Sequence, residues 1–246
     1  MRHRSYLAAL ALAGAVGTAA FAVTDGSPSA VGTAHAQQVP TVPLTGDDHT
    51  AALTQSRNAL ATAGLTLPDG WLPAWVQAAG HDQQSVTVVR YEQDARRDLG
   101  GEHITTVVGA DGTLLGYTRM TASAASGPAA TDRVAARTAA ATWLNGFAAD
   151  YAAGLDLQFV EPHEEQIRDS TGVTRTITGL KVKSHHASGL YAWTIVDGDG
   201  QVITYERDIR WDSGAGRRGT EMWMHDKWIA AREGSGPQPS SPYARA

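Results

Sequence analysis

Apolar residues recur at helical spacing up to Tyr151 and then at alternating positions as far as Trp211. Thr131-Asp132 is a suitable N-cap before the helical stretch, and Gly154 is a suitable stop after it. The alternating stretches are rich in Thr, Val and Ile, which favour strands. We therefore predict one helix followed by strands at residues 155–159, 175–183, 190–196 and 202–211.

The last two of these strands are predicted to form a hairpin, because Asp197-Gly198-Asp199-Gly200 supplies the positive-φ residues of a tight turn. The strand after the turn alternates apolar and polar side chains, which is typical of a sheet with one covered and one solvent-exposed face. We place Ile203, Tyr205, Ile209 and Trp211 on the covered face, and Thr204, Glu206, Asp208 and Arg210 on the exposed face.

A weaker version of the same order comes earlier in the chain. The stretch 65–80, with Pro73 between Trp71 and Trp75, is predicted to be an irregular connection packed on the sheet. The other predicted elements are a helix at 51–63 ended by Gly64, a strand at 86–92, and a hairpin of 104–109 and 113–120 around Asp111-Gly112.

The two parts are related by an internal repeat. Residues 107–119 align without gaps on residues 195–207, so that the residue numbers differ by 88, and five of the 13 positions are identical. A helix followed by antiparallel strands must lay its apolar stripe on one sheet face. The predicted architecture is α+β, with two tandem helix-plus-antiparallel-sheet units at 37–120 and 131–233, joined by a linker at 121–130.

Both ends of the chain have a different character. Residues 234–246 are rich in Gly, Ser and Pro, and we predict a disordered tail because this composition buries little apolar surface. Residues 1–36 are predicted to be a cleavable signal peptide, because two arginines precede an apolar run that is too short to span a membrane. Cleavage after Ala36 is favoured by the polar residues that follow, and cleavage after Ala22 is the alternative. The mature protein is expected to be secreted, with no stable membrane anchor.

Composition narrows the function classes. The chain contains no cysteine, which excludes disulfides, iron–sulfur clusters and thiolate zinc sites. Cleavage after Ala36 would remove Arg2, Arg4 and Asp25 from a chain of 20 basic and 25 acidic residues, which leaves a net charge of −6. This balance argues against nucleic acid as a partner.

The Gly-Leu-Tyr-Ala-Trp-Thr-Ile-Val strand, the Asp-Gly turn and the Tyr-Glu-Arg strand end resemble PepSY-type domains. These include the propeptide domains of secreted metallopeptidases and the repeated YcdB/YpeB-type units of bacterial envelope proteins. The resemblance covers residues 131–230 and, more faintly, 48–120. It implies a cystatin-like helix-and-sheet fold and a non-catalytic role, in some relatives the inhibition or chaperoning of a peptidase. No peptidase domain follows in this chain, so inhibition would act in trans.

Motifs for catalysis and metal binding are weak. No nucleophile elbow, phosphate loop or dinucleotide fingerprint is present, so we expect neither an enzyme nor a cofactor. His163-Glu164-Glu165 begins like a zinc-peptidase motif, but Ile167 stands where the second histidine belongs, and we interpret the segment as a solvated acidic loop. His185 and His186 are predicted to lie in an exposed loop. The alternative is a divalent metal site with Asp197 or Asp199.

Candidate binding residues come from the repeat and from the C-terminal aromatic residues. Arg119 and Arg207 occupy the same repeat position, on the same face as Tyr205, and each is expected to meet either a carboxylate of this chain or a ligand. Trp211 and Trp223 are expected either to close the core or to form an exposed aromatic patch for a partner. Glu206 and Asp208 are interpreted as a solvated ion-pair face beside the arginines.

Two functional hypotheses follow from the sequence. The first is a secreted, non-enzymatic PepSY-like protein that binds an extracytoplasmic protein, such as a peptidase, by strand addition at a sheet edge. The second is a small-molecule, metal-binding or enzymatic role in a cleft between the two units, which requires an apolar pocket with converging polar groups.

Overall fold

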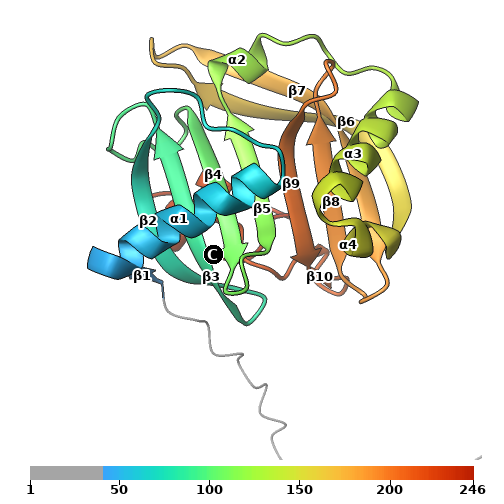
Figure 1. Cartoon of the computed structure of the whole chain (residues 1–246). Helices are drawn as coiled ribbons and strands as arrows, with labels where there is room; N and C mark the ends of the chain where they lie inside the picture. The colour runs from blue at the N-terminus through green and yellow to red at the C-terminus, as the bar shows by residue number, and fades with distance from the viewer. Residues whose placement is uncertain (1–40) are drawn as a thin grey trace, which may run out of the picture. The chain divides into compact units, whose positions relative to one another are not determined.

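The computed structural model describes residues 41–246, so the predicted signal peptide lies outside the described residues. The described chain forms a nine-stranded antiparallel sheet with most of its helices against one face, which confirms the α+β class (Figure 1). None of the described helices has both the length and the apolar character needed to span a bilayer.

The sheet has two halves of similar element order. The first half contains β1 (Val42–Pro43), α1 (Gly46–Thr62), β2 (Leu72–His81), β3 (Gln84–Glu92), β4 (His103–Gly109) and β5 (Leu114–Met120). The second half contains α2 (Ala122–Ala125), α3 (Arg133–Phe147), α4 (Ala149–Ala153), β6 (Leu155–Arg168), β7 (Thr174–His186), β8 (Tyr191–Val196) and β9 (Val202–Ile209). The C-terminal segment, residues 210–246, contains β10 (Trp211–Asp212), β11 (Arg217–Arg218) and α5 (Asp226–Arg232).

The strand order is β1-β2-β3-β4-β5-β9-β8-β7-β6, so the halves meet where β5 pairs with β9. At this seam Tyr117 lies opposite Tyr205, and Thr118 lies opposite Thr204. The two threonine hydroxyls are 2.9 Å apart and form a hydrogen bond. The two halves therefore form one continuous sheet.

Local sequence explains most of the elements. Asp132 caps α3 by accepting hydrogen bonds from the amides of Val134 and Ala135. Gly112 and Gly200 have φ of 84° and 77°, and they turn the β4–β5 and β8–β9 hairpins as the sequence predicted. The long helix predicted before Gly154 is divided into α3 and α4, because the backbone leaves helical geometry at Ala148.

The prediction of an irregular connection at residues 65–80 is wrong, since most of it forms β2. This strand pairs with β3 along its length and has a register shift between Pro73 and Trp75. On its other side β1 covers only a two-residue stretch. Pro73 is tolerated in β2 because it lies outside the stretch that pairs with β1, where no neighbouring strand needs its amide hydrogen.

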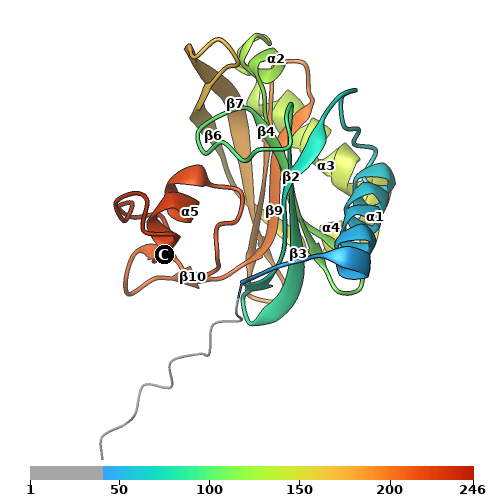
Figure 2. The same cartoon turned by 90° about the vertical axis from the view of Figure 1, so that its left-hand side faces the viewer.

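Helices α1, α3 and α4 cover one face of the sheet (Figure 2). Leu60 of α1 and Leu144 of α3 pack on the same cluster of buried residues as Tyr117 and Tyr205. Trp143 of α3 lies edge-on to Tyr205, with 5.1 Å between the ring centroids. Tyr205, predicted to be on a covered face, is fully buried here.

The opposite face is covered by the C-terminal segment (Figure 2). The prediction that Thr204 and Glu206 face solvent is therefore wrong, since their exposed fractions are 3% and 1%. Residues 234–246, predicted to be disordered, also contact the domain. Ala244 is buried, and the carbonyl of Arg245 accepts a hydrogen bond from Trp228 Nε1 at 3.2 Å. Composition alone did not reveal this partner surface.

Candidate functional site

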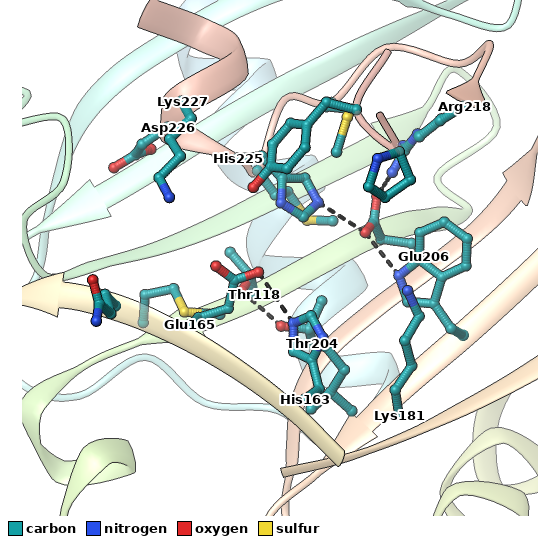
Figure 3. Close-up of a pocket in the computed structure, with 18 of the residues that line it drawn as sticks. Thr118, His163, Glu165, Lys181, Thr204, Glu206, Arg218, His225, Asp226 and Lys227 are labelled. Atoms are coloured by element: carbon teal, nitrogen blue, oxygen red, sulfur yellow. Dashed lines mark hydrogen bonds and ion pairs between the residues drawn. The ribbon is translucent and has the colours of Figure 1, made fainter. Parts of the chain in front are cut away.

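A cavity of about 350 Å³ lies between the second half of the sheet and the C-terminal segment, on the face opposite α1 and α3. Figure 3 shows the residues that line it. Strands β5 to β9 line it from one side, and residues 211–227 with Tyr243 line it from the other. Its apolar lining includes Met120, Ile167, Trp193, Ile195, Met222 and Met224.

Glu206 on β9 is the most enclosed charged group of this lining. One carboxylate oxygen accepts a hydrogen bond from Trp193 Nε1 at 2.8 Å and lies 3.0 Å from His225 Nε2. The other oxygen accepts a hydrogen bond from Arg218. Burial raises the pKa of Glu206, but the nearby Arg218 and His225 outweigh burial and hold the pKa below its usual range. Glu206 is therefore ionised at neutral pH.

A second carboxylate–imidazole pair lies on β6. His163 Nε2 is 3.1 Å from Glu165 Oε1, and Figure 3 shows this pair across from Glu206, Arg218 and His225. Burial raises the pKa of Glu165, but the hydrogen bond with His163 and the neighbouring charges lower it further, so the net shift is downward. The predicted acidic loop is wrong here. β6 continues through these residues, and alternation turns His163 and Glu165 to the cavity.

Two lysines on β7 face the same space. Lys181 Nζ lies 4.0 Å from the ring centroid of Trp193. Burial lowers the pKa of Lys181 to about 8. Lys183 Nζ lies 4.5 to 5.5 Å from three further ring centroids, those of Phe159, Tyr191 and Trp211. Cation–π contacts of this kind hold an ammonium group without a carboxylate partner.

At another edge of the cavity, Asp226 at the start of α5 pairs with a buried cation. Arg90 Nη1 is 2.6 Å from Asp226 Oδ1, and His103 Nδ1 is 3.8 Å from Asp226 Oδ2. Burial lowers the pKa of His103 to about 4, and the charge of Arg90 lowers it in the same direction. His103 is therefore neutral at physiological pH, and Asp226 is the counter-ion of Arg90.

This arrangement suits binding better than metal coordination. No group of three His, Asp or Glu side chains with metal-binding geometry occurs within residues 41–246. The enclosed space is mostly apolar, with a few polar groups converging on it, as in small-molecule sites. The imidazoles of His163 and His225, each beside a carboxylate, can donate a hydrogen bond to a ligand or accept one from it.

The predicted metal residues are separated by the strand on which they lie. His185 and His186 end β7 rather than occupying a loop. His186 stacks on Tyr151 at 4.4 Å, and His185 lies edge-on to Tyr191 at 4.8 Å. Adjacent strand residues point to opposite faces, so the two imidazoles do not converge.

The repeat-related arginines meet groups of their own chain. Arg119 Nη2 is 3.6 Å from Asp197 Oδ2, which lies in the turn of the other half. Arg207 Nε is 3.0 Å from Asp208 Oδ2, and its guanidinium covers the ring of Tyr151 at 3.5 Å. The expectation of a carboxylate partner from this chain is therefore confirmed for both.

Of the predicted aromatic and tyrosine binding residues, only Trp211 lines the cavity. Trp223 is buried against the first half of the sheet, where its Nε1 donates to the carbonyl of Gly80 at 2.6 Å. Tyr205 is enclosed by the helices on the opposite face. Trp223 and Tyr205 therefore belong to buried clusters and do not line this cavity.

Sequence reasoning missed the main polar residues of the cavity: His163, Glu165, Lys181, Arg218 and His225. A partial signal existed, since alternation in β6 and β7 places His163 with Glu165, and Lys181 with Lys183, on one face. What the sequence did not reveal is that residues 210–246 fold back over this face.

Comparison with known proteins adds no family to this description: no family model matches the chain, and the search of curated proteins finds no similar protein.

Proposed function

We propose that this protein binds a small, mainly apolar molecule in the cavity between the second half of the sheet and the C-terminal segment. The carrying observation is the cavity itself, which encloses about 350 Å³ and combines an apolar lining with converging polar groups. At about 30 Å³ for each water-sized group, this volume accepts on the order of a dozen non-hydrogen atoms. Secretion, expected from residues 1–36, would make the protein an extracytoplasmic carrier or receptor.

Titration with 1-aminoanthracene, a neutral apolar fluorophore, tests this function. We expect saturable binding to the purified chain, with a rise in dye fluorescence. Met120→Trp fills the cavity from β5 and is expected to abolish the signal. Val134→Trp is the matched control, because Val134 on α3 is 74% exposed and far from the lining residues. No saturable binding by the folded wild type, or equal binding by Met120→Trp, would contradict the proposal.

The PepSY-like resemblance leads us to propose also that the two halves are tandem copies of one helix-plus-sheet unit. Each half has a helix followed by four strands. Tyr117 and Tyr205, which share one repeat position, lie opposite each other at the seam. A two-fold relation between the copies would place equivalent residues in such a pair. Superposition of the halves in a crystal structure tests this, and different strand paths would contradict it.

The protein-partner hypothesis is supported by one surface, the outer edge of β6. This 14-residue strand ends the sheet order, and among the described residues its outer edge has only a bridge to Gly101 at Arg168. The amide of Arg168 points outward, donating to the Gly100 carbonyl at 2.7 Å. By alternation the amide of Glu164 also points outward, where an added strand could use it.

A proline at position 164 is expected to block strand addition at the outer edge of β6 without preventing folding. Glu164→Pro removes an outward amide and leaves the β6–β7 ladder intact, because Pro162 already occupies an equivalent position. We expect the variant to fold and to lose any inhibition of a co-secreted peptidase that the wild type shows. Inhibition that survives in Glu164→Pro would contradict strand addition at β6.

A further inference from the structure

Three lysines line the cavity without an ion pair to a described residue, and Lys181 is the one that burial affects most. Its ammonium lies over the Trp193 ring at 4.0 Å, and it forms neither a hydrogen bond nor an ion pair with any residue in 41–246. Lys183 is held by three rings, and Lys227 is exposed. A partly buried cation without an acceptor is costly, so a ligand that supplies one gains affinity.

The carboxylates around the cavity are already engaged. Glu206 forms hydrogen bonds or ion pairs with Arg218, His225 and Trp193. Asp226 is paired with Arg90, and Glu165 is bonded to His163. The remaining charge is therefore positive, and its most enclosed source is one ammonium group. One such group matches a monoanion better than a dianion, which would leave a charge uncompensated.

We propose that the ligand is an apolar monocarboxylate of about a dozen non-hydrogen atoms, whose carboxylate pairs with Lys181 and whose hydrocarbon part lies against Met120, Trp193 and Ile195. This proposal rests on the ligand-binding function proposed above and names the class of molecule bound. The three apolar side chains come from strands β5 and β8 and line the same cavity as the lysine. The flexible methionines Met222 and Met224 line its other side and adapt to chain shape.

Proton uptake should accompany binding. Burial lowers the pKa of Lys181, Lys183 on β7 and Arg218 on β11 lower it too, and Glu206 on β9 and Glu165 on β6 raise it. The other titratable groups that line the cavity are His103, His163, His225, Asp226, Lys227 and Tyr243. A bound carboxylate raises the pKa of Lys181 again. Above the free value the lysine must take up a proton to pair with the ligand, so affinity falls as pH rises through that range.

Calorimetry with decanoate and 1-decanol tests the proposal. Both have similar hydrocarbon parts, but only decanoate is an anion. We expect the wild type at pH 7.5 to bind decanoate at least tenfold more tightly than 1-decanol, with a preference that shrinks at pH 9.5. At pH 8.5, titrations in two buffers of different ionisation enthalpy should reveal proton uptake with decanoate and none with 1-decanol.

Three variants identify the responsible group. Lys181→Met should reduce decanoate affinity to that of 1-decanol while leaving 1-decanol binding unchanged, and Lys181→Arg should retain part of the preference. Lys183→Met is the matched control on the same strand and should keep it. Equal binding of the two ligands by the wild type, or a preserved preference in Lys181→Met, overturns the assignment. If 1-aminoanthracene binds and decanoate does not, only the carboxylate proposal falls; if neither binds, the proposed function falls with it.

Discussion

The C-terminal segment covers both halves of one sheet face, but it does so in two different ways. Over the first half, Met222, Trp223 and Trp228 pack directly on small buried residues such as Val88. Over the second half the sheet presents charged and aromatic side chains, and the same segment stands off from them to enclose a cavity. We infer that packing against the first half holds the C-terminal segment in place. The cavity over the second half can therefore remain unfilled without detaching the segment.

The largest expected effect comes from breaking the packed side of this comparison. Trp228 is 1% exposed and contacts Trp223 edge-on at 4.9 Å between centroids. Trp228→Ala is expected to lower the free energy of unfolding by about 4 kcal/mol, because it leaves a large cavity in a close-packed cluster. Urea unfolding measures this. Trp211→Ala, at a partly exposed position beside the ligand cavity, serves as the control and should cost clearly less; equal losses would contradict the assigned roles.

A slightly smaller loss of stability is expected from breaking the buried ion pair between Glu206 and Arg218 at the cavity. Glu206→Ala leaves the buried guanidinium of Arg218 without its carboxylate and should lower the free energy of unfolding by about 3 kcal/mol. The double variant with Arg218→Met removes the stranded charge and should recover much of the loss. If the double variant is as unstable as the sum of the two single variants, the pair is not coupled as described.

The dependence of stability on pH tests the region between the packed cluster and the cavity, where His103 lies. The unfolded chain protonates this histidine near its ordinary pKa of 6.5, but the folded protein does so only near 4. The unfolded state therefore binds more protons in this window, and stability falls as pH decreases from 6.5 to 4, by about 2 to 3 kcal/mol from this group.

Urea unfolding at pH 7 and at pH 4.5 measures this fall, and His103→Gln should make it smaller. The variant reports the change with pH, so a uniform loss of stability does not affect the conclusion. An unchanged pH dependence in His103→Gln would show that other groups cause the fall.

The smallest change in stability is expected from the ion pair that links the two halves, between Arg119 on β5 and Asp197 in the β8–β9 turn. Arg119 and Asp197 are 3.6 Å apart, and the arginine is 28% exposed. Arg119→Ala should therefore change stability by less than about 1 kcal/mol, because partly exposed ion pairs contribute little. Thermal unfolding measures the change, and a loss as large as that of Glu206→Ala would show that the seam depends on this pair.

Local patterns predicted the elements better than they predicted burial. The helices, the two hairpins and the turns at Gly112 and Gly200 follow from spacing and turn chemistry. The faces of β9 were assigned only in part: Thr204 and Glu206 do share a face opposite Tyr205, but that face was placed in solvent. The prediction that Ile209 and Trp211 lie with Tyr205 is wrong, because the strand has an irregularity between Glu206 and Ile209, and Trp211 lines the cavity beside Glu206. Alternation reports which residues share a face, and it does not report what covers that face. Covering by residues 210–246 is a long-range event without a local periodic signal.

The same limit explains the site. Each of Lys181, Glu206 and His225 is an ordinary polar residue in its local sequence. Their roles arise because three segments far apart in the chain meet around one cavity. The repeat indicated where the halves are alike, whereas the cavity depends on the segment that follows the repeat.

The seam between β5 and β9 has a consequence for the order of folding. Neighbouring strands within each half are joined by short connections, but Tyr117 and Tyr205 are far apart in the chain. Closing long loops costs more entropy, so we expect two independent strand meanders to form before the seam closes. The C-terminal segment, which needs both meanders as its platform, docks last. The cavity thus forms at the final step of folding. A bound ligand is therefore expected to slow amide hydrogen exchange most in the C-terminal segment.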